Sequence, residues 1–376
     1  MLTLNRKAGL TSMLTSKEDY KDYLVKENTN RVLYAALKNG SRVDSKCFSI
    51  MNGGNQWCRD KVVKAFIKQA NDQSIPVVHL KMGTACGETI CTDINYDPFA
   101  DISREDAVHL LQDMAEVKGL SRDDLHEPFM DMVYSCEGPF NIRAITCMNN
   151  RSVGFSAFQD YNDTVAASMT TKESKQATSL IDAIGKEWEQ IFILNKPGIS
   201  LSKALSIHGS ISIKAYKPLI LCAALTELES MSRNGRAFLI FEFPTGHLIN
   251  EKMMKYFVSA CTKYACFVVG ENLPGVTEEL WKYCSRNASL GIYFRPINEV
   301  AAVKISELFG EKKVEQREET TAETNQKFSL FGGARTKGYV KKTIMEAVMP
   351  QEKILGLRDM EAIVSMRGMH TIVSFL

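Results

Sequence analysis

The feature that most constrains the fold of this chain is a repeated alternation of strand-length apolar runs with helix-length amphipathic segments. An apolar run at 46–52 is followed by a helical pattern at 58–72 and by a second apolar run at 74–82. Strand, loop, helix and strand in this order are typical of a βαβ unit, whose two strands lie parallel in one sheet. The alternation resumes later, with expected strands at 209–216, 236–244, 265–272 and 290–296 and expected helices at 218–235, 250–264, 275–287 and 298–310. The predicted fold class is therefore α/β, with a mostly parallel sheet flanked by helices.

Between the two stretches of alternating pattern the periodicity changes to that of helices. Apolar residues at helical spacing dominate 104–190, although the segment 140–150 is also compatible with extended backbone. This predicts an all-α insertion, which divides the α/β domain into 46–103 and 191–376.

The two ends of the chain have patterns of their own. Residues 1–45 contain apolar side chains at helical spacing, so we expect an N-terminal helical segment. Residues 311–327 have almost no apolar content, which is typical of a solvated or mobile linker. Beyond this linker, 339–350 and 361–368 have the composition of strands.

Composition limits the classes of function. The 376 residues contain 46 Lys plus Arg and 44 Asp plus Glu, a formal net charge of +2, so no general attraction to nucleic acid or membranes is expected. Ten cysteines occur without a CxxC pair and without histidine at metal-ligand spacing, which favours reduced thiols and no metal site. No secretory signal and no membrane-spanning apolar run is evident, so we expect a cytoplasmic protein without a membrane anchor in this chain.

The first expected strand runs into a glycine pair, where a phosphate-binding loop would begin. Such a loop has the pattern GxxxxGK[ST], because its backbone amides and lysine contact the phosphates and its hydroxyl binds Mg²⁺. Counted from Gly53 and Gly54, the second glycine is replaced by Cys58, the lysine by Arg59 and the hydroxyl by Asp60. We interpret this segment either as a degenerate phosphate loop or as an ordinary turn between a strand and a helix.

Each replacement has a chemical consequence at such a loop. Cys58 adds a side chain where the backbone would approach a phosphate, and Asp60 places a carboxylate where polyphosphate charge would lie. Arg59 retains a positive charge, but its planar guanidinium does not reproduce a compact ammonium group. Trp57 is unexpected in a glycine loop; it either fills the space that a nucleotide would occupy or presents an aromatic ring to a partner.

A second motif lies in the expected strand 236–244. A strand that ends in Asp-Glu is typical of the Mg²⁺-and-water site of ATPases. Here Phe241 takes the aspartate position and Glu242 remains. The hypothesis is therefore that the metal-holding carboxylate is lost and a water-activating one persists; the alternative is an ordinary charged residue at a strand end.

The order of these elements from Lys46 onward resembles the cytosolic ATPase domain of type IV secretion coupling proteins. This TraG/TraD group consists of conjugation motors related to FtsK-like and HerA-like translocases. The segments that carry the resemblance are 94–103, 236–272, 297–313 and 348–368. The resemblance implies a RecA-like, P-loop NTPase-type sheet, with an all-α domain in the position of 104–190.

The resemblance also assigns further site positions. The family's sensor strand usually ends in glutamine, and here Glu271 takes that place. Thr262 and Lys263 align where these motors carry an arginine that reaches a neighbouring subunit's phosphate. Replacements at Asp60, Phe241 and Glu271 all act against Mg²⁺-triphosphate, which is the pattern expected of a pseudo-ATPase.

Three functions follow as hypotheses. The preferred one is a non-hydrolysing relative of the coupling ATPases that acts as a scaffold or adaptor, with protein partners in a secretion or conjugation apparatus and no cofactor. The second is a divergent, active DNA-translocating ATPase that uses ATP and Mg²⁺ with Arg59 and Glu242. The third is an α/β binding module whose old nucleotide cleft takes another ligand. An oligomer is possible under the first two, whereas DNA binding is not supported by the net charge.

Overall fold

The structure, a computed structural model, describes residues 48–72, 74–81, 94–136, 138–149, 171–189, 191–192, 196–215, 217–231, 237–243, 249–323, 335–366 and 369–374. The expected helical segment at 1–45 lies outside these residues.

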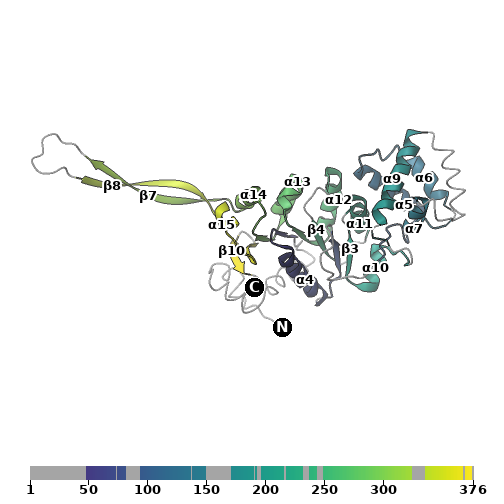
Figure 1. Ribbon diagram of the computed structural model, residues 1–376, viewed down its shortest axis with the longest axis horizontal. Helices are drawn as coiled ribbons and strands as arrows, with labels where there is room; N and C mark the ends of the chain where they lie inside the picture. Colours follow the sequence, from purple (N-terminus) through teal and green to yellow (C-terminus); the bar gives the residue numbers. More distant parts are fainter. Residues whose placement is uncertain are drawn as a thin grey trace, which may run out of the picture.

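An eight-stranded sheet forms the centre of the molecule (Figure 1). Its spatial order is β10-β9-β6-β1-β5-β4-β2-β3, and all neighbouring strands are parallel except at β9 and β10. The α/β prediction with a mostly parallel sheet is thus confirmed. The strands are β1 (Phe48–Asn52), β2 (Val77–Lys81), β3 (Ile211–Lys214), β4 (Phe238–Phe243), β5 (Ala265–Gly270), β6 (Leu290–Phe294), β9 (Glu361–Met366) and β10 (Met369–Ser374).

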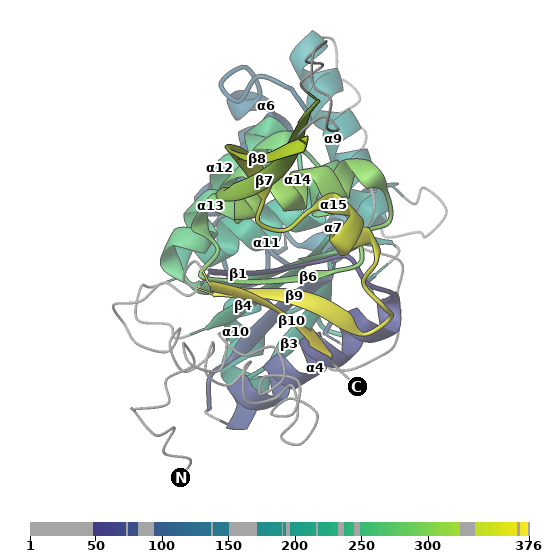
Figure 2. The ribbon, with the colours of Figure 1, turned by 90° about the vertical axis from the view of Figure 1, so that its left-hand side faces the viewer.

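Helices cover both faces of this sheet, which explains why its central strands read as continuous apolar runs. Figure 2 shows α4 on one face and α11 to α14 on the other. Successive residues of β1 alternate between the two faces: Ile50 packs in the core beneath α11 to α14, and Met51 packs in the core beneath α4. The helices on the two faces are α4 (Gln56–Asp72) on the first, and α11 (Pro218–Ser230), α12 (Glu251–Lys263), α13 (Glu278–Asn287) and α14 (Glu299–Phe309) on the second.

Every described element between β2 and β3 is a helix. They are α5 (Arg104–Val117), α6 (His126–Tyr134), α7 (Ile142–Asn149), α9 (Lys172–Trp188) and α10 (Leu201–His208). The ambiguous segment 140–150 is therefore helical from Ile142 to Asn149. These helices share one apolar core with the sheet, and the Trp188 indole donates to the Tyr96 carbonyl oxygen at 3.0 Å. The helical segment is consequently packed onto the α/β body through a common core.

The prediction of a linker at 311–327 is wrong for residues 311–323. These residues form β7 (Glu311–Glu323), which pairs antiparallel with β8 (Arg335–Ala347) in a separate two-stranded ribbon. Backbone hydrogen bonds satisfy both strands along their shared edge, so a sequence with little apolar content can still be extended and ordered. The ribbon projects away from the body beside α14 (Figure 1). The short helix α15 (Gln351–Leu355) then leads back to β9.

Candidate functional site

The glycine pair forms a turn of only three residues, since β1 ends at Asn52 and α4 begins at Gln56. Gly53 and Gly54 both have positive φ, 83° and 74°. The Gly53 amide donates to the Gly270 carbonyl oxygen at 3.0 Å, and the Gly54 amide donates to the Arg295 carbonyl oxygen at 3.2 Å. The turn is thereby attached to residues at the carboxyl ends of β5 and β6, the sheet edge where ligands bind in open α/β folds.

Asn55 closes the start of α4. Its side-chain oxygen accepts from the Cys58 amide at 2.9 Å, and its carbonyl oxygen accepts from the Arg59 amide at 3.2 Å. A phosphate-binding loop instead directs successive backbone amides at the phosphates. Residues 53–55 thus form a short turn closed by the Asn55 cap, and the amides of Gly53, Gly54, Cys58 and Arg59 are all bonded within the protein.

Arg59 folds back over this turn and is only 7% exposed. Its guanidinium donates to the Gly54 carbonyl oxygen and, at 2.8 Å, to Gln56 Oε1. Its Nη2 also lies 3.7 Å from Glu271 Oε2. The Arg59 guanidinium therefore holds the turn and pairs with the Glu271 carboxylate.

A chain of polar side chains extends from the turn across the sheet edge. Gln56 Nε2 donates to Asp60 Oδ1 at 2.8 Å and lies 3.4 Å from Glu242 Oε1. The other oxygen of Glu242 is 3.1 Å from His79 Nε2. Burial raises the pKa of Glu242, but the hydrogen bond and charge of His79 outweigh it, together with Lys81 and Gln56, so that the pKa is lowered overall. Glu242 is therefore a carboxylate at neutral pH.

Two of the predicted site residues point away from this edge. Phe241 is fully buried in the core beneath α12, where its ring lies 4.9 Å from the Phe257 ring. Cys58 is buried in the opposite core, with its sulfur 2.8 Å from Met360 Sδ, and burial raises the pKa of its thiol. Both side chains thus belong to the hydrophobic core and not to the sheet edge beside the turn.

The Trp57 side chain lies at the surface. It is 54% exposed, and Lys61 Nζ lies 3.8 Å from the centre of its ring. Of the two interpretations of this residue, the geometry fits an aromatic ring presented to the outside.

Thr262 and Lys263 are not brought to the glycine turn. They lie at the carboxyl end of α12, just before β5 begins, whereas the turn is attached at the end of β5. Thr262 Oγ1 donates to the Ser259 carbonyl oxygen, and Lys263 Nζ donates to the Glu229 carbonyl oxygen.

The sequence did not reveal that His79 contacts Glu242 in the polar chain at the sheet edge. His79 interrupts the apolar run at 74–82, and that interruption was the available signal. Asn52 is likewise a polar residue in an apolar strand, at the end of β1. It is fully buried, and its Oδ1 accepts from the Leu273 amide at 2.7 Å. Both contacts, His79 with Glu242 and Asn52 with Leu273, join residues far apart in the sequence, so the sequence pattern does not predict them.

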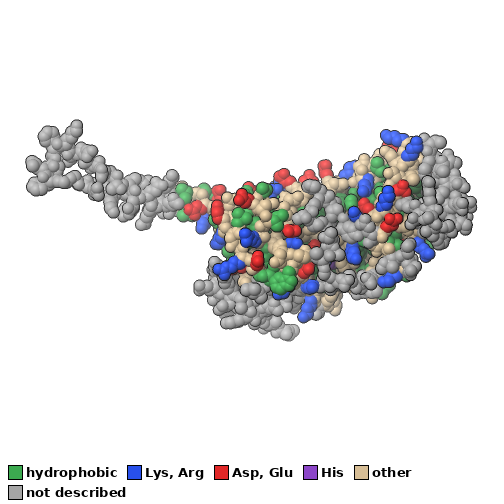
Figure 3. All heavy atoms as spheres, in the orientation of Figure 1, with side chains coloured by type: hydrophobic (Ala, Val, Ile, Leu, Met, Phe, Trp, Pro, Cys, Tyr) green, Lys and Arg blue, Asp and Glu red, His purple; other side chains and the backbone are tan. Residues whose placement is uncertain are grey.

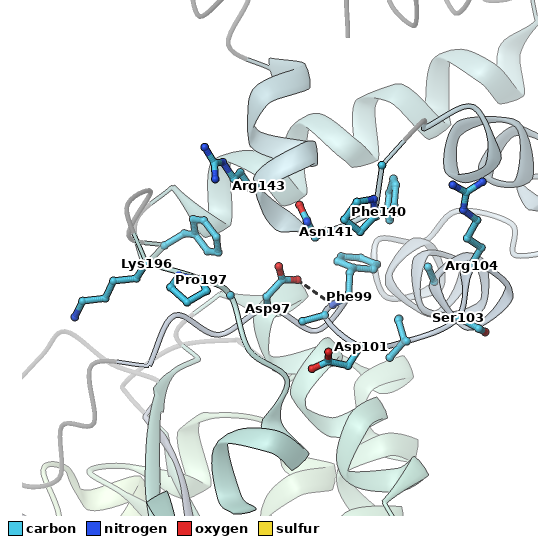
Figure 4. A pocket seen from close by; sticks show the side chains of 17 residues that line it. Asp97, Phe99, Asp101, Ser103, Arg104, Phe140, Asn141, Arg143, Lys196 and Pro197 are labelled. Atoms are coloured by element: carbon cyan, nitrogen blue, oxygen red, sulfur yellow. Dashed lines mark hydrogen bonds between the residues drawn. The ribbon is translucent and has the colours of Figure 1, made fainter. Parts of the chain in front are cut away.

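A hollow of about 1060 Å³ lies away from the glycine turn, where the helical segment joins the α/β body (Figure 4). An isolated bridge between Tyr96 and Ile199 holds the two connecting segments together there. Asp97 lies at its centre, accepting from the amides of Phe99 at 3.0 Å and Ile142 at 3.1 Å. Burial raises the pKa of Asp97 to about 6, against the opposing effect of these amides. The sequence offered no motif for this hollow beyond the polar start of the segment 94–103.

Within the described ranges, no group of three or more His, Cys, Asp or Glu side chains is arranged to hold a metal ion. Nor is any helix of that part of the chain both long and apolar enough to span a bilayer.

No protein-family model and no curated protein matches this sequence. Solved structures do match it. The unbound bacterial conjugative coupling protein TrwB superposes with a TM-score of 0.58 and 9% identity, over 89% of this chain and 86% of that chain. A TrwB crystal form with sulphate gives 0.56 and 12% identity over 90% and 86%, and TrwB with ADP and Mg²⁺ gives 0.53 and 11% over 90% and 85%. At such identities the likeness establishes the fold: this chain has the RecA-like, P-loop NTPase-type fold of the coupling proteins, as the resemblance implied.

Proposed function

We propose that this protein is a non-hydrolysing relative of the conjugative coupling ATPases and acts as a scaffold or adaptor in a type IV secretion or DNA-transfer system. The observation that carries the proposal is the three-residue turn between β1 and α4. Its glycine amides are bonded to the Gly270 and Arg295 carbonyl oxygens, and the Arg59 guanidinium lies over it. A chain that has the coupling-protein fold but closes this turn fits a protein that keeps the architecture and lacks nucleotide chemistry.

The electrostatics of the sheet edge support the same proposal. Three carboxylates, those of Asp60, Glu242 and Glu271, lie around the turn, and Arg59 is already paired with one of them. A triphosphate brings several negative charges, which these carboxylates would repel unless a cation intervened. Phe241, at the position that would hold Mg²⁺, lies in the core and offers no oxygen ligand. Accordingly, we propose that the protein functions without ATP or Mg²⁺.

One observation favours an alternative, a divergent active ATPase. Glu242 is ionised and is held by His79 and Gln56, so it has the charge and the orientation of a group that could activate water. Under this alternative the Arg59 guanidinium would have to leave Gly54 to meet a phosphate.

The test is a titration of labelled ATP with Mg²⁺, followed by a hydrolysis assay on the full chain. We expect no saturable binding at nucleotide concentrations on the order of 1 mM and no turnover above the buffer rate. Micromolar binding with turnover that Glu242→Gln abolishes would overturn the proposal and establish the alternative. Glu279→Gln, at an exposed position of α13, is the matched control, because it removes a carboxylate remote from the turn.

The role in transfer is tested in the host of the protein. Deletion of the gene should reduce transfer of DNA or protein, and the Glu242→Gln chain should restore it as well as the unchanged chain. Transfer that is indifferent to the deletion would contradict the scaffold role, and failure of Glu242→Gln alone would favour the enzyme.

A further inference from the structure

Among the described elements, the ribbon of β7 and β8 has the least internal support. Its strands pair over 13 residues each and form a sheet of two strands only. An isolated two-stranded ribbon is marginally stable in water, and a long strand with an unpaired edge is a template for further pairing. Within the described part of the chain, neither outer edge of this ribbon has a strand beside it. The arrangement is that of an arm whose partner is another molecule.

The foot of the ribbon is firmly attached to the body. Gly310, at the end of α14, accepts from the Val348 amide at 2.9 Å, and Ser306 Oγ donates to the Met349 carbonyl oxygen at 2.6 Å. The base of the ribbon is therefore held against α14 by a side-chain hydrogen bond and by the last rung of its own backbone ladder.

Exposed apolar side chains are concentrated at this foot. Five of the eight large hydrophobic residues exposed in the described structure lie on α14, just before it, or at the base of β8, and Figure 3 shows apolar side chains at the foot of the ribbon. They are Ile297, Val300, Val303, Leu308 and Met345, with exposed fractions of 51%, 66%, 40%, 37% and 54%. Such a concentration marks a surface that a partner covers.

The two strands of the ribbon differ in charge. The sequence of β7 contains five glutamates against two lysines and one arginine, a net charge of −2. The sequence of β8 contains three lysines and one arginine against one glutamate, a net charge of +3. One outer edge of the ribbon is thus an acidic strand and the other is a basic strand.

We propose that the ribbon is an assembly arm, in which β8 of one copy of this chain pairs edge to edge with β7 of the next copy. The opposite charges of the two edges favour a second copy of the chain as the partner, in a head-to-tail contact. A two-fold contact would instead join like edges, acidic to acidic or basic to basic. A head-to-tail contact joins the basic edge to the acidic edge and continues the antiparallel alternation of strands. The apolar side chains around α14 are buried at the foot of the same contact.

The proposal goes beyond the absence of nucleotide chemistry and does not depend on it, because its test uses no nucleotide. The full chain is examined by sedimentation velocity over a concentration series, beside a chain without the arm. Val314 and Ile344 face each other in register, so residues 315–343 can be replaced by an Asn-Gly turn that joins them. We expect the full chain to associate and the shortened chain to remain a monomer with an unchanged thermal midpoint. A full chain that is monomeric at concentrations on the order of 100 µM, or a shortened chain that associates equally, would overturn the proposal.

A mixing experiment tests the pairing of unlike edges. One variant carries Glu315→Lys, Glu318→Lys and Glu319→Lys, which makes both strands basic. The other carries Lys337→Glu, Lys341→Glu and Lys342→Glu, which makes both strands acidic. Each alone should lose association at least tenfold in affinity, and an equimolar mixture should regain it as a mixed assembly. Recovery on mixing cannot come from repair of the ribbon within one chain, so a mixture that stays monomeric contradicts edge-to-edge pairing.

Discussion

Gly53 shows most clearly how a single residue determines the chemistry of the candidate site. Its φ of 83° belongs to the left-handed region, and a Cβ there would lie 2.8 Å from both the Phe294 and the Arg295 carbonyl oxygens. Glycine is therefore needed at this position because the end of β6 approaches the turn closely. A glycine in a phosphate loop is needed for a different reason, the approach of a phosphate. At Gly53 the glycine is thus required by the neighbouring strand end and not by a bound phosphate.

Gly53→Ala should destabilise the protein more than Gly119→Ala. Gly119 has a φ of 80° but nothing within 4 Å of the added carbon, so its substitution costs only backbone strain, about 1–2 kcal/mol. At Gly53 the contact with two carbonyl oxygens adds to that strain, and we expect a loss of about 3 kcal/mol or more. Urea unfolding monitored by circular dichroism measures both. Equal losses would mean that the strand ends do not confine the turn.

At the scale of elements, Glu227 of α11 joins α10 to the connecting segment 94–103, which leads into the helical segment. Its carboxylate accepts from the Ser202 amide at 3.1 Å and from the Tyr96 hydroxyl at 3.2 Å. Burial raises the pKa of Glu227 to about 7, which the two hydrogen bonds oppose. The carboxyl group therefore releases its proton with more difficulty in the folded protein than in the unfolded chain.

This shift predicts a pH dependence of stability. Between its unfolded value of 4.5 and the folded value of about 7, Glu227 binds more protons in the folded state. Stability contributed by this group is therefore present at low pH and decreases as pH rises through that window. Glu227→Gln should remove this decrease and be more stable than the unchanged chain at pH 8, by on the order of 1–3 kcal/mol.

Thermal unfolding of both chains between pH 5 and pH 8 measures the effect. Glu229→Gln is the matched control on the same helix, because Glu229 is exposed and its bond from Ser259 survives in the amide. Parallel pH profiles for the Glu227→Gln chain and the unchanged chain would contradict the prediction.

At the scale of the whole molecule, the sheet and the helical segment share one hydrophobic core. Residues of α5, α9 and α11 belong to the same buried cluster as residues of β1 and β4. Structural units with a common core are expected to unfold together. The ribbon is the exception, since it extends from the body and contributes little to that core.

Two of the three tryptophans report separately on the helical segment and on the α/β body. Trp188 lies in α9 and Trp281 in α13, and both are buried, whereas Trp57 is exposed. In chains that retain only Trp188 or only Trp281, with phenylalanine at the other positions, the fluorescence transition in urea should coincide with the far-ultraviolet dichroism transition of the same chain. A fluorescence midpoint in the Trp188 chain that precedes the dichroism midpoint would show that the helical segment unfolds on its own.

Much of the fold was predictable because its signals are local. The apolar runs of β1, β4 and β5 and the helical spacing of α12 are each set by neighbouring residues, and burial on both faces of a sheet requires such runs. The linker prediction was wrong for 311–323 because the conformation of this segment depends on a distant partner and not on neighbouring residues. Its strand conformation comes from pairing with 335–347, and a ribbon that projects from the body does not need an apolar pattern.

By itself, the sequence determined the α/β alternation, since periodicity and hydrophobicity act over short distances. The loop motif, the strand motif and the family resemblance singled out Arg59, Asp60, Glu242 and Glu271 as candidate site residues. Only the tertiary structure decided what these groups do. The bond from His79 to Glu242 spans 163 positions and the closure of the turn depends on the Gly270 and Arg295 carbonyl oxygens. Such contacts depend on strand order and register, which no local pattern specifies.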